Sequence, residues 1–434
     1  MLLRFRVANH RSIRDEAELS LVSSSLQTIN PRDGDWAGAT TRVTAIYGAN
    51  AAGKSNLLDA VDFAVDAVRH SATTWAENKS FPFRPFRLTD ADNRSPSFYE
   101  LSVVVDDIRY DYGFRCTAQG VHNEWLYSYP EGRRRQLFVR NGPGKDSISF
   151  SRNLPGDNAL TASLLRPRSL YLSVAANANH ELLQRIQHRI AYHILYAKYS
   201  EMDRLARLRM VMEAVEDPGA LEQAVALLKM ADVGITNVAV KDDELPRALR
   251  SLIERILDNG DDGKERHSQE AVQNFTKNLS FLHSAANGKE FELSQSDESS
   301  GTLAWIALAV PALRAFRHRD VLLVDELDAS IHPYLASALV EMFKNPAINS
   351  TGAQIIFTTH DVAFMNPSFP ASLKPDEVWF TEKKSDGATE LYSLAEYPTR
   401  RTENFSKRYL DGRYGAVPLV DLDALVGVLH QDKA

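Results

Sequence analysis

The sequence predicts an α/β fold in which a mixed sheet is joined by an antiparallel β subdomain and a helical insertion. Three observations lead to this prediction. An apolar strand over residues 43–47 runs into a glycine-bearing loop and then into an amphipathic helix that extends to about residue 70. Residues 97–151 hold short alternating runs separated by turns, which is typical of antiparallel strands. After residue 290, helix and strand patterns alternate, as they do in α/β proteins.

The composition indicates an ordinary globular protein. The 434 residues are 44% hydrophobic and 25% charged, and this length suggests two lobes or a core with an insertion. The net charge of −7 excludes uniform attraction to nucleic acid, so any such binding needs a local basic patch. The single cysteine, Cys116, excludes an intramolecular disulfide. Because the N-terminus also lacks the apolar block of a signal peptide, we expect a cytoplasmic protein.

The expected elements divide the chain into four parts. The most apolar stretch, residues 304–313, contains Pro311 and is too short to span a bilayer, so we expect a core helix and no membrane contact. The four expected parts of the chain are the N-terminal half of the α/β region (1–177), a helical insertion (178–290), the C-terminal half of the α/β region (291–400) and a tail (401–434). The expected strands and helices are strands at 2–8, 16–22, 97–105, 108–114, 121–128, 135–140, 321–325 and 353–358, and helices within 178–232 and at 245–257, 268–282, 302–317 and 333–344.

Residues 48–55 have the pattern of a phosphate-binding loop. Gly48 and Gly53 let the backbone curl so that its N–H groups point inward, and the helix that begins near Lys54 adds its positive end. In this motif the lysine reaches the β- and γ-phosphates, and the hydroxyl of Ser55 binds Mg²⁺. We therefore expect a bound nucleoside triphosphate with Mg²⁺. The expected nucleotide contacts are Gly48, Ala49, Asn50, Ala51, Ala52, Gly53, Lys54, Ser55 and Asn56.

ATP is favoured over GTP as the nucleotide. Guanine selection normally shows the pattern Asn-Lys-x-Asp. The segment at Asn78 and Lys79 continues with serine and phenylalanine and lacks the aspartate. A GTPase is therefore the less favoured alternative.

A second part of the expected site follows the apolar strand at 321–325. Asp325 lies at the carboxyl end of this strand, where it would hold Mg²⁺ directly or through water, and Glu326 would orient or deprotonate the attacking water. Two solvated acids at a strand end are the alternative. His360 ends the next strand, 34 residues past Glu326, where it could stabilise charge on the transferring phosphoryl group. Glu326, His360 and Lys54 are the expected catalytic residues.

Ser299, Ser300 and Gly301 open the helix predicted at 302–317. Ser299 could do no more than cap that helix. However, Gly301 lies 24 residues before Asp325, one helix and one turn away. This is the layout of the ABC-type signature, in which a serine and a glycine bind the γ-phosphate of a nucleotide held by a facing subunit. Asp328 would then lie across the subunit boundary, near the partner's nucleotide.

Together these motifs resemble the ABC-type ATPases of the RecF, SMC and OLD group. Four motifs match in order, and the opening residues 5–13 are similar to the group's first strand and turn, so Arg11 is an expected ATP contact. The tail at 408–416 resembles the AbiLi type, and the resemblance covers about residues 1–418. The four motifs are residues 48–55, residues 299–301, residues 321–326 and His360. Three segments resemble stand-alone members linked to bacterial phage defence, namely residues 85–88, 124–126 and 228–235.

The resemblance implies a P-loop ABC-type ATPase head that dimerises on ATP and hydrolyses it to drive or time a conformational change. Such a homodimer, or larger homo-oligomer, senses infection and controls a separate effector, often a nuclease. The chain departs from the transporter form by Ser300 and Thr302 in the signature, by a longer interval before it, and by the lack of a clear glutamine loop between 70 and 100. A DNA-repair ATPase of RecF or SMC type and an ATP-stabilised scaffold with little turnover remain alternatives.

Two further features of the sequence concern nuclease chemistry and nucleic-acid binding. Asp421 and Asp423 resemble the paired acids of a TOPRIM nuclease, but only eleven residues follow them, so we expect a solvated turn and an effector in trans. Two groups of basic residues are candidate nucleic-acid contacts, although such runs are usually a solvated face. They are Arg133, Arg134, Arg135, Arg140 and Lys145, and then Arg204, Arg207 and Arg209.

Overall fold

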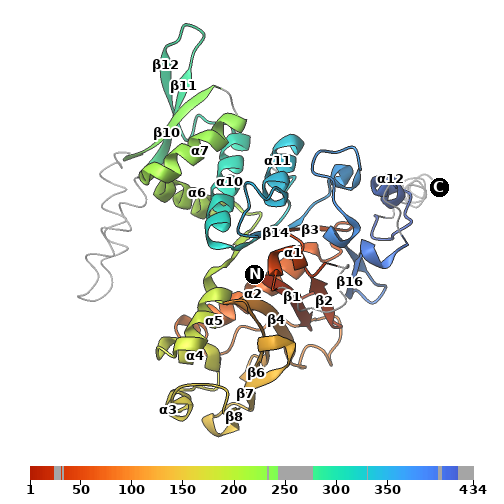
Figure 1. Cartoon of the computed structure of the whole chain (residues 1–434). Coiled ribbons are helices and arrows are strands. Elements are labelled where there is room, and N and C mark those ends of the chain that lie inside the picture. The colour runs from red at the N-terminus through yellow and green to blue at the C-terminus, as the bar shows by residue number, and fades with distance from the viewer. Residues whose placement is uncertain are drawn as a thin grey trace, which may run out of the picture. The chain divides into compact units, whose positions relative to one another are not determined.

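The computed structural model describes residues 1–23, 31, 34–231, 234–242, 277–329, 331–398 and 403–418. The chain forms two compact units (Figure 1). The first consists of Met1–Tyr196, Ala315–Glu326 and Val340–Ala434, and the second of Ala197–Arg314 and Leu327–Leu339. The helix predicted at 245–257 and the paired acids Asp421 and Asp423 lie outside the described residues.

A seven-stranded antiparallel sheet forms one layer of the first unit. It confirms the antiparallel strands predicted between 97 and 140 and adds the two N-terminal strands at one edge, where β1 pairs with β4. In spatial order the strands are β2 (Ala17–Ser20), β1 (Leu2–Ala8), β4 (Ser97–Val105), β5 (Ile108–Thr117), β6 (Gly120–Tyr129), β7 (Arg135–Asn141) and β8 (Ile148–Phe150).

A six-stranded mixed sheet carries the predicted motifs. Its three central strands, β3, β14 and β13, are parallel, so their carboxyl ends meet at one edge, the usual place for ligands in such sheets. The strand β9 was not expected within the stretch predicted as helical. In spatial order the strands are β16 (Thr389–Ser393), β15 (Val378–Lys383), β3 (Val43–Tyr47), β14 (Gln354–Thr358), β13 (Val321–Val324) and β9 (Ile194–Ala197).

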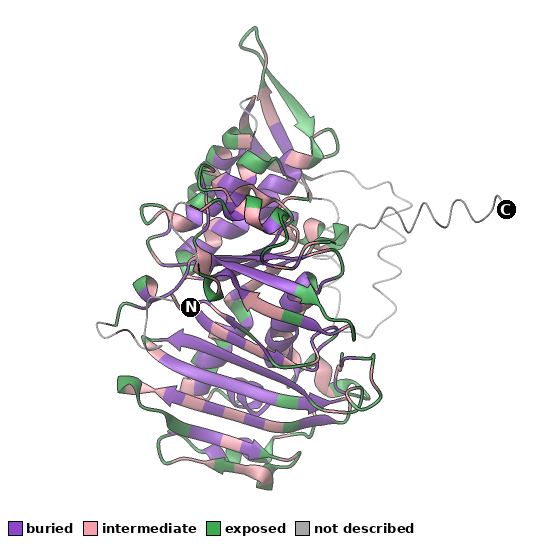
Figure 2. Ribbon diagram, turned by 90° about the vertical axis from the view of Figure 1, so that its right-hand side faces the viewer, coloured by how far each residue is buried: buried purple, intermediate pink, exposed green. Residues whose placement is uncertain are grey.

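The helix α2 (Lys54–His70) follows the phosphate loop and lies in the core of the first unit (Figure 1). It packs against α4 (Tyr171–Asn177) and α5 (Glu181–Tyr192), and α5 packs against β4. Figure 2 shows many buried residues in the sheets, and most residues of α2 and α4 are buried as well. Since each fully buried large aliphatic or aromatic side chain is worth roughly 1.5–3 kcal/mol, this packing holds the start of α2 in place beneath the loop.

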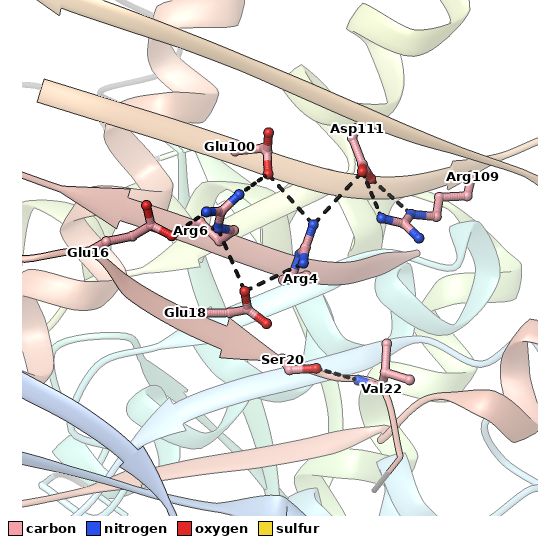
Figure 3. Close-up of polar contacts among 9 residues, drawn as sticks. All are labelled: Arg4, Arg6, Glu16, Glu18, Ser20, Val22, Glu100, Arg109 and Asp111. Atoms are coloured by element: carbon pink, nitrogen blue, oxygen red, sulfur yellow. Dashed lines mark hydrogen bonds and ion pairs between the residues drawn. The ribbon is translucent and has the colours of Figure 1, made fainter. Parts of the chain in front are cut away.

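Charged side chains occupy part of the seven-stranded sheet (Figure 3). Arg6 donates to Glu100 at 2.9 Å, and Arg109 donates two hydrogen bonds to Asp111 at 2.7 and 2.9 Å. Arg4 lies 3.6 Å from Glu100 and 3.8 Å from Asp111. These arginines are therefore paired with carboxylates, so this part of the sheet is not a bare basic surface.

The second unit combines helices with a small antiparallel sheet. Its helices are α6 (Glu201–Glu216) and α7 (Pro218–Ala231), and its sheet contains β10 (Ile235–Asp242), β11 (Lys277–Ser284) and β12 (Glu290–Ser294). The helix predicted at 268–282 is wrong for residues 277–282. These residues pair with strands on both sides, and such tertiary pairing overrides local propensity.

Two longer helices confirm the α/β prediction for the last third of the chain. The helix α10 (Ser300–His318) begins in the second unit, where Trp305 donates to the carbonyl of Leu227 at 2.7 Å, and α11 (Pro333–Lys344) matches its predicted bounds. The remaining short helices are α1 (Trp36–Ala39), α3 (Asn158–Ser163), α12 (Phe405–Leu410) and 3₁₀ turns at Thr74–Glu77, Pro130–Gly132, Lys145–Ser147, Val362–Met365, Pro375–Glu377 and Leu394–Glu396.

Candidate active site

The loop between β3 and α2 is curled as a phosphate-binding loop must be. The backbone φ is +155° at Gly48 and +107° at Gly53, both in the region that favours glycine. A Cβ at Gly48 would lie 2.4 Å from the carbonyl oxygen of Thr381, and one at Gly53 would lie 2.3 Å from Oγ1 of Thr389. Glycine is therefore required at both positions by conformation and by the close approach of β15 and β16.

Lys54 closes the loop from inside. Its side chain is buried, and Nζ donates to the carbonyl of Gly48 at 2.8 Å and to that of Ala49 at 3.3 Å. Asn50 and Ala51, at the crest of the loop, are exposed. The ammonium group thus lies among acceptors that phosphate oxygens could replace, and anionic oxygens would form stronger, charge-assisted hydrogen bonds with it.

A chain of hydrogen bonds joins the loop to the strand edge. The hydroxyl of Ser55 donates to Oδ1 of Asp325 at 2.9 Å, and the hydroxyl of Thr358 donates to the same oxygen at 2.7 Å. Mg²⁺ usually binds one or two protein oxygens together with substrate phosphates. The hydroxyl of Ser55 and the carboxylate of Asp325 are such oxygens and are already adjacent, so this pair fits the ion that the sequence predicts.

Glu326 has an unusual backbone conformation. Its φ is +52°, in the left-handed region that non-glycine residues rarely adopt and that is often found at functional sites. Its backbone N–H donates to Oγ1 of Thr358 at 2.7 Å. Glu326 directly follows Asp325 after the end of β13 and is half-buried. The role of Glu326 as a base for the attacking water stays a prediction.

Thr358 is the residue that sequence reasoning missed. It ends β14 and is fully buried, and its hydroxyl contacts both acids after β13. The only signal in the sequence is a polar residue at the end of an otherwise apolar strand, and that signal does not reveal what the hydroxyl contacts.

His360 follows β14 and is exposed. The hydroxyl of Tyr47 donates a hydrogen bond to the carbonyl of the next residue, Asp361, at 3.0 Å. Tyr47 is the residue before Gly48, so this bond connects the segment after β14 to the start of the loop. The role of His360 at the γ-phosphate stays a prediction.

Arg11 lies beside α2. Its Nε contacts Oδ2 of Asp59 at 2.5 Å, and Arg84 contacts the other oxygen of that carboxylate at 2.8 Å. Burial acts to raise the pKa of Asp59, but His10 and the two arginines outweigh it and hold this pKa well below its usual value. Asp59 therefore stays ionised and fixes Arg11.

A cavity of about 520 Å³ lies next to Arg11. Its lining includes Ser12, Asn56 and the cations Arg84, Arg87 and Lys383. The amide of Asn56 donates to the hydroxyl of Ser12 at 2.6 Å, so the cavity borders the residue that follows Ser55. The ATP contacts expected of Arg11 and Asn56 stay predictions.

The predicted signature residues belong to the second unit. Ser299 caps α10, because its Oγ accepts a hydrogen bond from the N–H of Thr302 at 3.0 Å, while Ser299 and Ser300 remain exposed. Gly301 and Asp328 are half-buried. The capping role is thus present, and the contact of these four residues with a partner's nucleotide stays a prediction.

The basic residues singled out in the sequence differ in their surroundings. Arg140 is fully buried, and the prediction that it contacts nucleic acid is wrong. It lies 3.5 Å from Glu124 and donates to the carbonyl of Ser169 at 2.7 Å. Glu124 also accepts hydrogen bonds from the N–H groups of Tyr171 and Leu172 at 2.7 and 3.0 Å, so this ion pair anchors the start of α4.

The other basic residues lie nearer the surface. Arg133 and Arg134 are exposed, whereas Arg204 pairs with Glu201 and Arg207 pairs with Asp203. Among the described helices, none combines the length and the apolar character that crossing a membrane requires.

Comparison with known proteins identifies one family. The family described as "AAA domain, putative AbiEii toxin, Type IV TA system" matches residues 43–366, about three-quarters of the chain. The match includes the loop at 48–55, the acids after β13 and His360. No curated protein matches the sequence.

Solved structures of SMC heads resemble the chain. One is the SMC head domain from Thermotoga maritima, with 14% identity and a TM-score of 0.40 over 90% of this chain and 98% of that one. Another is an SMC head bound to the C-terminal winged-helix domain of ScpA, with 13% identity and a TM-score of 0.38 over 90% of this chain and 97% of that one. These values are too low to transfer the role of any residue.

Proposed function

The chain belongs to the AAA-domain family described above, and from this premise we propose that it is a Mg²⁺-dependent ATP hydrolase that dimerises on ATP. The observation that carries the proposal is the contact between the hydroxyl of Ser55 and the carboxylate of Asp325 at 2.9 Å. It joins the residue after the loop lysine to the acid that precedes Glu326. A surface turn with two solvated acids would have no reason to bring these groups together.

Each candidate site residue of the first unit has a proposed role. Ser55 and Asp325 would hold Mg²⁺, which supplies positive charge to the phosphate oxygens. Lys54 would leave the carbonyls of the loop for the β- and γ-phosphates, and the N–H groups of residues 48–53 would surround the phosphates. Glu326 would orient the attacking water and accept its proton, and His360 would donate to the γ-phosphate.

The proposed dimer completes the site. Ser299, Ser300, Gly301 and Asp328 would meet the nucleotide bound by the partner subunit. Ser299 and Ser300 are exposed at the start of α10, where the free N–H groups and the helix dipole favour an anion. In this proposal residues 1–177 and 291–400 form the ATPase head, residues 178–290 are its insertion, and residues 401–434 are a tail.

Replacing Ser299 with arginine tests the dimer. We expect S299R to bind ATP as a monomer with nearly unchanged affinity but to lose ATP-dependent dimerisation, because the long cation fills the place of the partner's γ-phosphate. Light scattering with a non-hydrolysable ATP analogue measures the dimer, and Mg²⁺-dependent ATP turnover should fall with it. Loss of the Ser299 cap itself costs about 1 kcal/mol, which thermal unfolding measures.

S296R is the matched control. Ser296 is exposed three residues before Ser299 and lies outside the signature. The S296R variant should dimerise on ATP like the wild type. An S299R protein that still dimerises on ATP, or that loses ATP affinity as a monomer, would contradict the facing-subunit arrangement.

The biological role that we propose is bacterial anti-phage defence in the cytoplasm. The AbiLi-like tail and the segments at 85–88 and 124–126 support it, and a separate nuclease-like effector would do the damage. A DNA-repair ATPase of RecF or SMC type and an ATP-stabilised scaffold are the alternatives. An adjacent gene for a nuclease-like protein would support defence, whereas a replication-gene neighbourhood would support repair.

Nucleic acid is a second proposed ligand. Arg134 lies over the ring of Tyr127 at 3.7 Å, and Phe98 stacks on Trp125 with 5.8 Å between ring centroids. These four residues line a cavity of about 380 Å³ on the seven-stranded sheet. Aromatic side chains next to arginines are typical of surfaces that stack single-stranded bases.

The affinity for a short single-stranded oligonucleotide should fall steeply with salt, and R134E should weaken it roughly tenfold, because it replaces a cation beside the aromatic rings with an anion. Fluorescence anisotropy measures both effects. R185E is the control, because Arg185 is paired with Asp106 on another surface element. Equal binding by R134E and the wild type would exclude this surface.

A further inference from the structure

The hydroxyl of Thr358 lies at the junction of the proposed catalytic groups. It accepts a hydrogen bond from the backbone N–H of Glu326 at 2.7 Å and donates one to Oδ1 of Asp325 at 2.7 Å. A single oxygen thus contacts the backbone N–H of Glu326 and the carboxylate of Asp325, and Asp325 in turn accepts from Ser55. The four residues form one continuous chain from the phosphate loop to the proposed base.

The position of Thr358 follows from the sheet. β14 lies between β3 and β13, and Val324 pairs with Phe357, so the first residues after β13 lie beside Thr358. On the other side, Thr358 pairs with Ile46 of β3, next to the loop. Among the described strands, only β14 has both β3, which precedes the loop, and β13, which precedes the acids, as neighbours. The side chain is fully buried, so we do not expect it to contact a nucleotide bound at the surface.

The strained backbone at Glu326 suggests what the hydrogen bond from its N–H to Thr358 does. A non-glycine residue at φ +52° is disfavoured by about 1 kcal/mol or more unless its surroundings hold it. The N–H of Glu326 is turned toward the end of β14, and the hydroxyl of Thr358 accepts it there. The hydrogen bond that Thr358 donates also restricts the rotation of the Asp325 carboxylate. One hydroxyl therefore restrains both the backbone turn from which the Glu326 side chain projects and the orientation of the Asp325 carboxylate.

We propose that Thr358 is a positioning residue for ATP hydrolysis, which holds Glu326 and Asp325 in the geometry that the reaction needs. This inference rests on the hydrolysis proposed above for the same site. Because Thr358 is fully buried, we expect it to touch neither the nucleotide nor the attacking water. It acts through Glu326, whose backbone turn it holds, and through Asp325, whose Oδ1 also accepts a hydrogen bond from Ser55.

The test is a set of variants that remove or keep the hydroxyl in the full-length chain. T358V keeps the shape of threonine, and its kcat should fall roughly 10- to 100-fold, the range expected when a hydrogen bond to a charged group is lost. The Mg²⁺ concentration for half-maximal turnover should rise, because Asp325 loses its restraint. ATP affinity measured without Mg²⁺ should stay within about twofold, because Thr358 does not contact the phosphate loop. T358S, which keeps the hydroxyl, should recover most of the turnover.

T44V is the matched control. Thr44 is buried on the neighbouring strand β3, and its hydroxyl contacts only the hydroxyl of Thr41 at 3.4 Å among the hydrogen bonds described. T44V should keep the wild-type kcat and Mg²⁺ dependence. If T358V does not fold, T358S and T358A decide the question, since both lack the methyl group and differ only in the oxygen.

The outcomes separate the two proposals. The role of Thr358 alone would be overturned if the wild type hydrolyses ATP and T358V has the same kcat and Mg²⁺ dependence. It would also be overturned if T358S and T358A lose turnover equally. A wild-type chain that binds ATP but never hydrolyses it would overturn the proposed hydrolysis itself, whatever the variants do.

Discussion

Replacing Glu326 with glutamine should lower ATP turnover about 1,000-fold, within the range that general-base catalysis contributes. Glutamine has the size of glutamate and can still orient water, but it cannot accept a proton at neutral pH. The backbone N–H of residue 326 keeps its bond to Thr358, so the fold and the ATP affinity should persist. The protein should therefore accumulate as an ATP-bound dimer, which size-exclusion chromatography with retained nucleotide measures.

The E326Q experiment also separates the enzyme from the scaffold. An ATPase whose hydrolysis times a conformational change should lose its biological function in E326Q, whereas an ATP-stabilised scaffold should keep it. E213Q is the matched control, because Glu213 is exposed on α6 and should leave turnover unchanged. Wild-type turnover in E326Q would show that Glu326 is not the base, even though it follows Asp325.

Replacing Lys54 with alanine should weaken ATP binding roughly 100-fold or more. Lys54 is the buried cation of the loop, and charge-assisted hydrogen bonds to phosphate are each worth about 1.5–3 kcal/mol. The variant also removes the hydrogen bonds to the carbonyls of Gly48 and Ala49, so the melting temperature should be measured alongside. Isothermal titration calorimetry with a non-hydrolysable analogue gives the affinity.

K289A is the control for the Lys54 variant, since Lys289 is an exposed lysine outside the loop. Its affinity for the analogue should equal that of the wild type. Retention of affinity within about threefold in K54A would contradict the phosphate-binding role of residues 48–55, and with it the basis of the proposed hydrolysis.

The parts of the candidate site that the sequence predicts correctly are those carried by contiguous residues. Gly48 and Gly53 occupy positions of positive φ, and α2 begins at Lys54, as the motif requires. The apolar run at 321–324 forms a buried parallel strand, and Asp325 follows it at the carboxyl edge of the parallel strands. In each case the signal is local, because the turn, the helix start and the strand end all depend on neighbours within a few residues.

The predictions that failed depended on distant neighbours. Residues 277–282 were expected to be helical, but strands on both sides pair with them. Arg140 was expected to face solvent, but its position on the sheet turns it inward toward Glu124, 16 residues earlier in the chain. An arginine in a basic run gives no indication of such a partner, since the pairing arises only when β6 and β7 align.

By itself, the sequence determined the α/β class, the glycine turns of the loop at 48–55 and the buried strand that ends before Asp325, because helix starts, glycine turns and buried strands are specified by short segments of chain. Only the tertiary structure decided that Ser55, Asp325, Thr358 and Glu326 share one chain of hydrogen bonds. Those contacts join residues up to 270 positions apart. They depend on the order and register of β3, β14 and β13, which no local pattern specifies.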